Sequence, residues 1–589
     1  MEKLKIYKLL RRVEKPARYI GGEAGSIVKS NPSIRFAFAF PDVYEIGMSY
    51  LGLQIIYDFI NKREDSACER VFMPWVDMAR LMRENKVPLF ALESQEPISS
   101  FNFMGFTLQH EAAYTNVLAM LNLAGLSPFS SERGEDAPII CAGGPCCVNP
   151  EPMADFIDFF YIGDIEANFN AILNKYKKGV KKTDFLRSIA NLEGVYVPFL
   201  YEPIYSELGF LKEFKPKEGA PSKIKKVVAS PNPEPINPII PSIETSQFRA
   251  AVELFRGCKH GCRFCQAGYI HNPVRFRKRE EVAECARSLL KATGHEELSL
   301  LSLSSSDYPD FLPLLGEILE YATPKNISVS LPSLRIDAVT AEALKKTASV
   351  RKSSVTFAPE AGSQRMRNVI GKNISHLEII DGAWEVFDAG FDSCKLYFML
   401  GLPTETEDDL RDIIELARCI RYEYITHPKR EGKNSLRISL SVACFIPKPH
   451  TPFQWEAMDD ESVLRSKQKI IKEEINKNDK KFLTYRYHDA SVAKIEAILA
   501  RGDRRIGSVI YEAWRAGQEF CGWSEFFDAS VWESAFDLTE VNPDFYLREI
   551  KTDELLAWDF IDVGTSKNLL LRERASAYEA AKWGISSER

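Results

Sequence analysis

The sequence lacks any uninterrupted apolar run long enough to cross a membrane, and residues 1–12 contain no apolar segment of the signal-peptide type. It also lacks a marked excess of charge. The net charge of −6 over 589 residues argues against nonspecific nucleic-acid binding by the whole chain, but it leaves room for a local basic patch. Apart from residues 141–147 and 258–265, the 12 cysteines are scattered. We expect no membrane partner and a reducing, cytoplasmic location.

The length predicts several domains rather than one, and the apolar and charged fractions are those of an ordinary globular protein. Residues 204–245 are rich in proline and lysine and predict a linker. We therefore expect an N-terminal domain over residues 1–203, a core over residues 246–459 and a small C-terminal α/β region over residues 460–589.

Three cysteines stand close together at Cys258, Cys262 and Cys265, in the pattern C-x3-C-x2-C. They directly follow an apolar run at residues 250–255 that predicts a buried strand. The thiols therefore lie on a loop at the C-terminal end of a strand, where the chemistry of parallel α/β proteins collects. We call residues 256–265 the cluster loop.

Thiolates are the usual ligands of iron–sulfur clusters, and a [4Fe–4S] cluster takes four ligands. Three cysteines would leave one iron open to a small molecule. The alternatives are a structural zinc site and three unrelated buried thiols. Zinc needs a fourth Cys or His, and His260 lies between two of the thiols, where it could hardly complete a tetrahedron. The spacing favours the cluster.

The cluster loop resembles that of the radical S-adenosylmethionine (SAM) enzymes, and the segments after it support the resemblance over residues 245–455. In that superfamily SAM chelates the open iron, and the reduced cluster cleaves SAM to a 5′-deoxyadenosyl radical. The resemblance implies a [4Fe–4S] cluster and SAM as cofactors, and an electron donor such as flavodoxin or ferredoxin. From about residue 12 to residue 562 the chain resembles an uncharacterised bacterial family of radical SAM proteins with a B12-binding domain, related to the methylthiotransferase-like enzymes.

The N-terminal part alternates strands and helices. Strands are predicted at residues 34–40, 101–107 and 138–142, and helices at residues 51–60 and 111–124. Repeated strand–turn–helix units imply a parallel sheet with helices on both faces, and ligands of such sheets bind beyond the C-terminal strand ends.

These strand ends resemble the cobalamin-binding Rossmann-like domain, whose first strand is followed by Asp-x-His-x-x-Gly with the His as lower cobalt ligand. Here the segment from Asp42 to Gly47 reads Asp-Val-Tyr-Glu-Ile-Gly, with Tyr44 in place of the His. The later turns resemble Thr107-Leu108 and Gly143-Gly144, and glycines let the backbone approach a flat ligand closely. The resemblance implies cobalamin contacts at Asp42, Tyr44, Gly47, Gly143 and Gly144. Without the His, either cobalt lacks a protein imidazole or the domain only packs on the core.

Two groups of residues favour a structural interpretation. Cys141, Cys146 and Cys147 stand near the glycine turn, but adjacent cysteines chelate one metal poorly, so we expect buried thiols. Lys223, Lys225 and Lys226 lie in the linker and most simply form a solvated face.

The core predicts a partial (β/α)6 TIM-like barrel, because six apolar strands alternate with helical stretches. An incomplete barrel leaves a side opening for a large substrate. The predicted strands are residues 250–255, 298–303, 327–331, 354–358, 394–400 and 438–445.

Polar residues follow the barrel strands, and the family resemblance implies that they contact SAM. A carboxylate can bridge ribose hydroxyls or an ammonium group, and arginine suits the SAM carboxylate. Singly, each residue could be a helix cap or a surface ion pair, but their position at successive strand ends favours the functional interpretation. The candidates are Ser304 and Ser306 after the second strand, Ser333 and Arg335 after the third, Glu360 and Arg365 after the fourth, Lys395 on the fifth, and Phe264, which could pack against adenine.

The C-terminal region contains one segment of mixed character. Residues 480–488 interleave basic and aromatic residues, which is typical of a nucleic-acid surface, although a solvated, half-buried strand is commoner. The leading hypothesis for the whole chain is a radical SAM enzyme, and a cobalamin-dependent methyltransferase is the simplest use of both cofactors. The alternatives are a cobalamin-independent RNA-modifying enzyme and a non-catalytic iron–sulfur binding protein.

Overall fold

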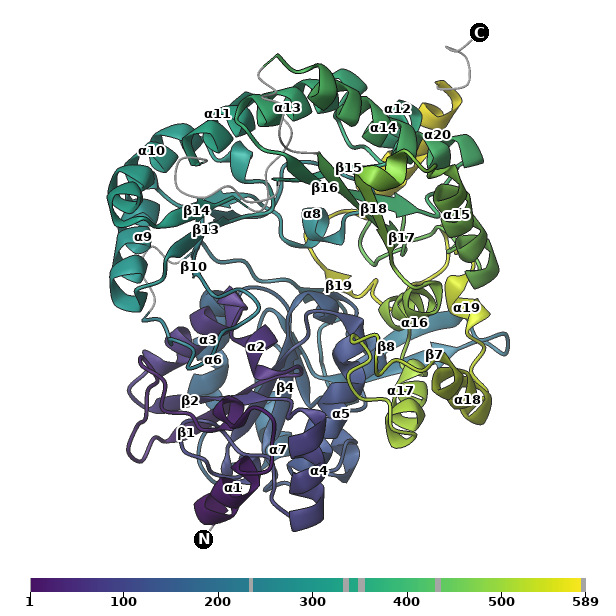
Figure 1. Ribbon diagram of the computed structural model, residues 1–589. Coiled ribbons are helices and arrows are strands. Elements are labelled where there is room, and N and C mark those ends of the chain that lie inside the picture. The colour runs from purple at the N-terminus through teal and green to yellow at the C-terminus, as the bar shows by residue number, and fades with distance from the viewer. Residues whose placement is uncertain (1, 232–236, 332–337, 348–354, 429–435, 584–589) are drawn as a thin grey trace.

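The computed structural model describes residues 2–231, 237–331, 338–347, 355–428 and 436–583. Its N-terminal domain occupies the lower half of Figure 1, the barrel occupies the upper half, and the C-terminal helices run down one side of both. Ser333 and Arg335 lie outside the described residues. None of the helices in the described part of the chain combines the length and the hydropathy that a bilayer crossing needs.

The N-terminal domain is built on a six-stranded sheet in the order β2-β1-β3-β4-β5-β6. Its strands are parallel except for the last pair, β5 with β6. The three predicted strands are confirmed, but β2 was not predicted, because it carries Glu69 and Arg70 in an otherwise apolar stretch. The strands are β1 (Ile34–Phe40), β2 (Ser66–Phe72), β3 (Phe103–Thr107), β4 (Ile139–Gly143), β5 (Phe159–Tyr161) and β6 (Val195–Tyr196). The main helices are α3 (Leu51–Asn61), α5 (Tyr114–Leu123), α6 (Ile165–Lys175) and α7 (Lys182–Ile189).

The barrel consists of two parallel sheets, in the orders β10-β13-β14 and β15-β16-β17-β18. All six predicted strands are confirmed. A seventh, β18, forms from the basic and aromatic segment, so the half-buried strand is the correct interpretation of its structure. The strands are β10 (Ala250–Glu253), β13 (Glu297–Leu301), β14 (Ser328–Ser330), β15 (Val355–Glu360), β16 (Ser393–Leu400), β17 (Arg437–Cys444) and β18 (Leu483–Tyr487).

Helices cover the outer side of the barrel (Figure 1). Apolar residues alternate along each strand, and the buried set packs against the helices, as the two-residue period of a strand requires. The covering helices are α9 (Arg279–Thr293), α10 (Phe311–Ala322), α13 (His376–Asp388), α14 (Glu407–Thr426) and α15 (Glu461–Glu474).

The C-terminal region contacts both domains. Helix α17 (Ile506–Arg515) packs on α5 of the N-terminal domain, and α20 (Lys567–Trp583) packs on α12 (Gln364–Val369) of the barrel. The short strand β19 (Ile561–Asp562) pairs in parallel with β9 (Ile224–Lys225) of the predicted linker. The end of the chain therefore helps to hold the two domains together.

Candidate functional site

The cluster loop leaves the barrel through β11 (Phe255–Arg256) and runs into the short helix α8 (Gln266–Ile270). Gly257 has φ +85°, and a Cβ atom there would come within 2.9 Å of the Pro273 carbonyl oxygen, so the tight entry to the loop requires glycine. Inside the loop, the Cys265 amide donates to the Cys262 carbonyl at 3.1 Å. The three thiols are half-buried and free.

The thiols lie close enough to influence one another. Burial, opposed by the nearby Lys372 ammonium and assisted by the charges of Cys265 and Cys258, raises the pKa of Cys262 to about 11. Burial also raises the pKa of Cys265. Iron or zinc would deprotonate such thiols outright. In the described part of the chain, no three His, Cys, Asp or Glu side chains are grouped so as to hold one metal ion. A [4Fe–4S] cluster has a different requirement, because each thiolate binds a separate iron, so this donor set fits a cluster better than zinc.

Asp307 joins the cluster loop to the serine-rich segment that follows β13. Its carboxylate lies 2.5 Å from His260 Nε2 and 3.0 Å from Lys259 Nζ. Ser304 is buried, and the Ser306 hydroxyl is buried without a hydrogen-bond partner among the described residues. The structure therefore brings the two predicted segments together and leaves a buried hydroxyl for a ligand.

Arg263 anchors the cluster loop from within, a role that no sequence pattern predicts. Its guanidinium donates to the carbonyls of Asn368 (2.9 Å) and Val369 (2.8 Å), and its Nε lies 3.3 Å from a carboxylate oxygen of Glu573 on α20. The next residue, Phe264, is partly buried in an apolar cluster with residues of α12 and α20. The C-terminal helix therefore supports the loop directly.

Glu360 lies near the thiols in an unusual backbone conformation. Its φ of +68° is in the left-handed region, which costs a non-glycine residue energy and often marks a functional site. Burial raises the pKa of Glu360, and its charge in turn raises the pKa of Cys262 and Cys265. Lys372 Nζ lies 3.5 Å from the carboxylate. Glu360 therefore lies beside the cluster loop, and its contact to a cofactor stays a prediction.

Two other predicted SAM contacts have partners of their own. Arg365 forms an ion pair with Asp409 and donates to the Thr404 carbonyl at 2.8 Å. Lys395 lies over the ring of Tyr397, with Nζ 4.5 Å from the ring centroid.

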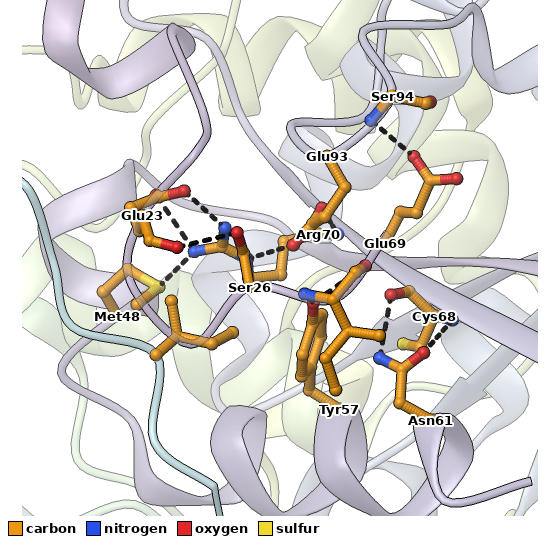
Figure 2. Close-up of polar contacts among 12 residues, drawn as sticks. Glu23, Ser26, Met48, Tyr57, Asn61, Cys68, Glu69, Arg70, Glu93 and Ser94 are labelled. Atoms are coloured by element: carbon orange, nitrogen blue, oxygen red, sulfur yellow. Dashed lines mark hydrogen bonds and ion pairs between the residues drawn. The ribbon is translucent and has the colours of Figure 1, made fainter. Parts of the chain in front are cut away.

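The segment from Asp42 to Gly47 is packed into the N-terminal domain. The buried Tyr44 hydroxyl donates to Glu23 at 3.0 Å, and Glu23 in turn forms an ion pair with Arg70 at 2.7 Å (Figure 2). Asp42 accepts a hydrogen bond from the Trp523 indole at 3.2 Å. A Cβ atom on Gly47 would come within 2.3 Å of the Phe72 ring. These three predicted contacts therefore do not line the cavity described next.

A cavity of about 440 Å³ lies between the N-terminal domain and the barrel, within the size range of small-molecule sites. One wall contains Thr107, Gly143 and Gly144, all from the predicted turns. The N-terminal domain also contributes aromatic and small residues to the lining: Phe36, Phe38, Gly52, Gly105, Cys141 and Phe169. The opposite wall belongs to the barrel and the cluster loop: Arg256, Gly257, His271, Leu301 and Leu303. The cavity thus connects the glycine turn with the start of the cluster loop.

The barrel wall of the cavity is fixed by buried charges. Arg256 forms ion pairs with Glu166 of α6 at 2.7 Å and with Glu253 at 2.9 Å. Burial lowers the pKa of His271 to about 4, so its imidazole is neutral at pH 7. Neither Arg256 nor His271 was predicted from the sequence as a residue of this site, because its place in the cavity wall depends on contacts with the N-terminal domain.

The prediction that Lys223, Lys225 and Lys226 form a solvated face is wrong for Lys226. Lys223 and Lys225 are exposed, but Lys226 lines the cavity, and its Nζ donates to the carbonyls of Ile270 (2.8 Å) and Asn272 (2.6 Å). Burial lowers its pKa to about 8. The lysine satisfies carbonyls at the end of α8, so the linker holds the segment that follows the cluster loop. Cys141, Cys146 and Cys147 are buried free thiols, as predicted.

Comparison with known proteins gives matches along both domains. Residues 52–198 match the family model for the N-terminal part of radical SAM proteins, and residues 252–417 match the model for the radical SAM superfamily. An uncharacterised protein of Methanocaldococcus jannaschii is 26% identical over 91% of this chain and 98% of its own length. A tRNA-2-methylthio-N(6)-dimethylallyladenosine synthase of Carboxydothermus hydrogenoformans is 25% identical over 30% of this chain and 41% of that enzyme.

Two solved structures also align with the chain. The radical SAM methyltransferase TsrM of Kitasatospora setae, solved with cobalamin and a [4Fe–4S] cluster, aligns with a TM-score of 0.47 and 12% identity over 70% of this chain and 75% of its own. The cobalamin-dependent radical SAM enzyme OxsB aligns with a TM-score of 0.46 and 12% identity over 94% and 80%.

Proposed function

Because the chain belongs to the radical SAM superfamily of enzymes, we propose that Cys258, Cys262 and Cys265 hold its [4Fe–4S] cluster and that cobalamin occupies the cavity between the two domains. A reduced cluster held by these thiolates would supply the electron for the reductive cleavage of SAM. Arg263 and Asp307 hold the cluster loop in place from two sides. Glu360 and the Ser306 hydroxyl offer an acceptor and a hydroxyl for the polar groups of SAM beside the loop.

The proposal that cobalamin binds here rests on one observation, that a single cavity connects the N-terminal domain with the cluster loop. The cavity runs from the glycine turn of the N-terminal domain to Gly257, next to the first cluster cysteine. A ligand in this cavity is therefore enclosed by the same loop that presents the thiols. Its aromatic and glycine lining suits a flat apolar group, and a carrier of methyl groups placed here would adjoin the SAM site. Methyl transfer to an unactivated carbon is the reaction that this arrangement supports best.

RNA modification without cobalamin is the second candidate. The similarity to tRNA methylthiotransferases favours it, as do Arg486 and Tyr487, which are exposed on β18. An electron donor such as flavodoxin or ferredoxin and a reducing cytoplasmic location follow from an oxygen-sensitive cluster in either case.

Anaerobic reconstitution with iron, sulfide, SAM and hydroxocobalamin tests the proposal. The wild-type protein should show the EPR spectrum of a [4Fe–4S] cluster that changes when SAM is added, and it should retain cobalamin after gel filtration. The triple variant C258A/C262A/C265A should hold no cluster. Full iron loading in that variant would refute the assignment of the ligands.

Gly143→Leu tests the cavity separately. Gly143 does not have a positive φ, and an added Cβ would meet only the Tyr161 carbonyl oxygen at 3.5 Å, so the larger side chain fills the cavity without straining the backbone. Gly143→Leu should lose cobalamin but keep the cluster. The matched control is Gly134→Leu, at an exposed position with open space around it. If wild-type protein binds no cobalamin, the RNA-modifying enzyme becomes the better candidate.

A further inference from the structure

The inner face of the four-stranded barrel sheet differs sharply from its outer face. Leu396 on β16 and Leu440 on β17 are buried in the hydrophobic core. Helices cover the outer side of this sheet (Figure 1). The alternate residues point to the inner side and are half-buried or exposed. On β16, β17 and β18 they are Ser393, Lys395, Tyr397, Met399, Arg437, Ser439, Ser441, Ala443, Thr484 and Arg486.

The strand register sets these side chains in rows. Lys395 stands opposite Ser439, which stands opposite Thr484. In the next row Tyr397, Ser441 and Arg486 are aligned in the same way. Adjacent strands are about 4.8 Å apart and the two rows are about 6.6 Å apart along the strands, so Lys395 on β16 and Arg486 on β18 stand about 12 Å apart across the serines of β17. Both side chains are long enough to meet above those serines.

The cations on this face are uncompensated. On β16, β17 and β18 the face carries three cations and no carboxylate, and the carboxylate of Glu360 at the end of β15 pairs with Lys372. None of Lys395, Arg437 and Arg486 forms an ion pair with another residue in the part of the chain that the structure describes. In the other barrel sheet, β10-β13-β14, the cation Arg249 is paired. Its guanidinium lies 3.0 Å from a Glu297 carboxylate oxygen and 3.2 Å from the Ser330 hydroxyl. Unpaired cations that line the inside of a barrel raise the local concentration of anions.

We propose that this inner face binds a phosphate group of the substrate, with Lys395 and Arg486 as the charged contacts and Ser439 and Ser441 as hydroxyl donors. The inference rests on the proposed radical SAM function and adds the substrate class to it. A phosphate group suits the face better than a carboxylate, because its additional oxygens match donors spread over two rows and three strands. The Tyr397 ring beneath the Lys395 ammonium holds that cation on the inner face.

Inorganic pyrophosphate is the probe, titrated into the reconstituted holoprotein by isothermal calorimetry. Lys395→Met and Arg486→Met should each weaken its binding about tenfold or more, the loss expected for one charge-assisted contact, and the double variant should show no saturable binding. Lys395→Arg should retain most of the affinity. The control is Lys582→Met, since Lys582 is exposed on α20 and pairs with Glu579 on the same helix. The EPR change on adding SAM should be the same in wild type, Arg486→Met and Lys582→Met.

Several outcomes would overturn the inference. One is the absence of pyrophosphate binding to wild-type holoprotein. Another is a double variant that binds pyrophosphate as tightly as wild type. A third is equal displacement of pyrophosphate by malonate, which would indicate a carboxylate site. If the variants lose the SAM-dependent EPR change together with pyrophosphate binding, Lys395 and Arg486 belong to the SAM site instead. A protein that assembles no cluster contradicts the proposed function itself, and this failure is seen before any titration.

Discussion

Replacing Lys448 should clearly weaken the junction of the N-terminal domain, the barrel and the C-terminal region. It lies in the proline-flanked segment after β17, and its Nζ is 2.9 Å from both carboxylate oxygens of Glu111 and 2.9 Å from Glu496. Glu111 belongs to the N-terminal domain, and Glu496 lies on α16 (Ala490–Arg501) of the C-terminal region. Burial alone would lower the pKa of Lys448, but the two carboxylates raise it well above its usual value.

Lys448→Met should lower the free energy of unfolding by about 3 kcal/mol. Removing one member of a buried ion pair costs about 3–5 kcal/mol, because the remaining charge stays buried without compensation. We expect the lower end of this energy range because only one of the two carboxylates is deeply buried. The Glu111 side chain is 6% exposed, whereas that of Glu496 is 28% exposed and keeps part of its hydration. Methionine preserves most of the apolar contacts of the lysine stem, so the loss reports mainly on charge.

Anaerobic urea unfolding at pH 7, followed by tryptophan fluorescence and circular dichroism, measures this loss. Lys469→Met is the control, because Lys469 forms an exposed pair with Glu473 at 3.6 Å and such pairs contribute less than about 1 kcal/mol. The double variant K448M/E111Q should recover part of the lost stability, since it removes the more deeply buried of the two unpaired charges. A loss below about 1 kcal/mol in K448M, or a double variant no more stable than the single one, would refute the reasoning.

The free energy of unfolding of wild type and that of K448M should depend differently on pH. The neighbouring Lys448 ammonium holds the pKa of Glu496 below its usual value despite burial. Its stabilising contribution is therefore present above the unfolded-state pKa of about 4.3 and is lost as the pH falls through the lower folded-state pKa. In K448M the carboxylates are destabilising when charged, and protonation relieves them. The difference in stability between wild type and K448M should therefore shrink as the pH falls from 7 toward 4.

Four further outcomes are expected. Tyr44→His should add no nitrogen coupling to the EPR spectrum of bound cob(II)alamin, because position 44 is buried against Glu23 and away from the cavity; a coupled spectrum would contradict this placement. Glu360→Gln should weaken SAM binding by about tenfold without changing the iron content, and unchanged affinity would remove Glu360 from the site. Arg70→Met should lower the free energy of unfolding by about 4 kcal/mol in the same urea assay, because it leaves two buried carboxylates, and a loss within the range of exposed residues would contradict the buried pair. Arg263→Ala should make the protein lose iron faster than wild type on desalting, and equal retention would show that the loop needs no such anchor.

Features that depend on residues close together in the chain could be predicted from the amino-acid sequence. The three cysteines occupy one loop, so their spacing alone predicts a cluster. The barrel strands and the strand–turn–helix units of the N-terminal domain follow from hydrophobic periodicity, which requires no knowledge of distant contacts. The positions of Gly143 and Gly144 at a strand end are local in the same sense, and both line the cavity.

Only the tertiary structure decided where charged residues are buried. Strand β2 escaped prediction because Arg70 is an unfavourable core residue until Glu23 and Glu93, each more than 20 residues away, pair with it (Figure 2). Lys226 could not be separated from its exposed neighbours, since the carbonyls that it satisfies lie on the far side of the cluster loop. A buried charge is stable only with a partner, and the chain brings such partners together from distant positions. The shared cavity, the anchoring of the cluster loop by α20 and the cationic inner face of the barrel all arise from that folding.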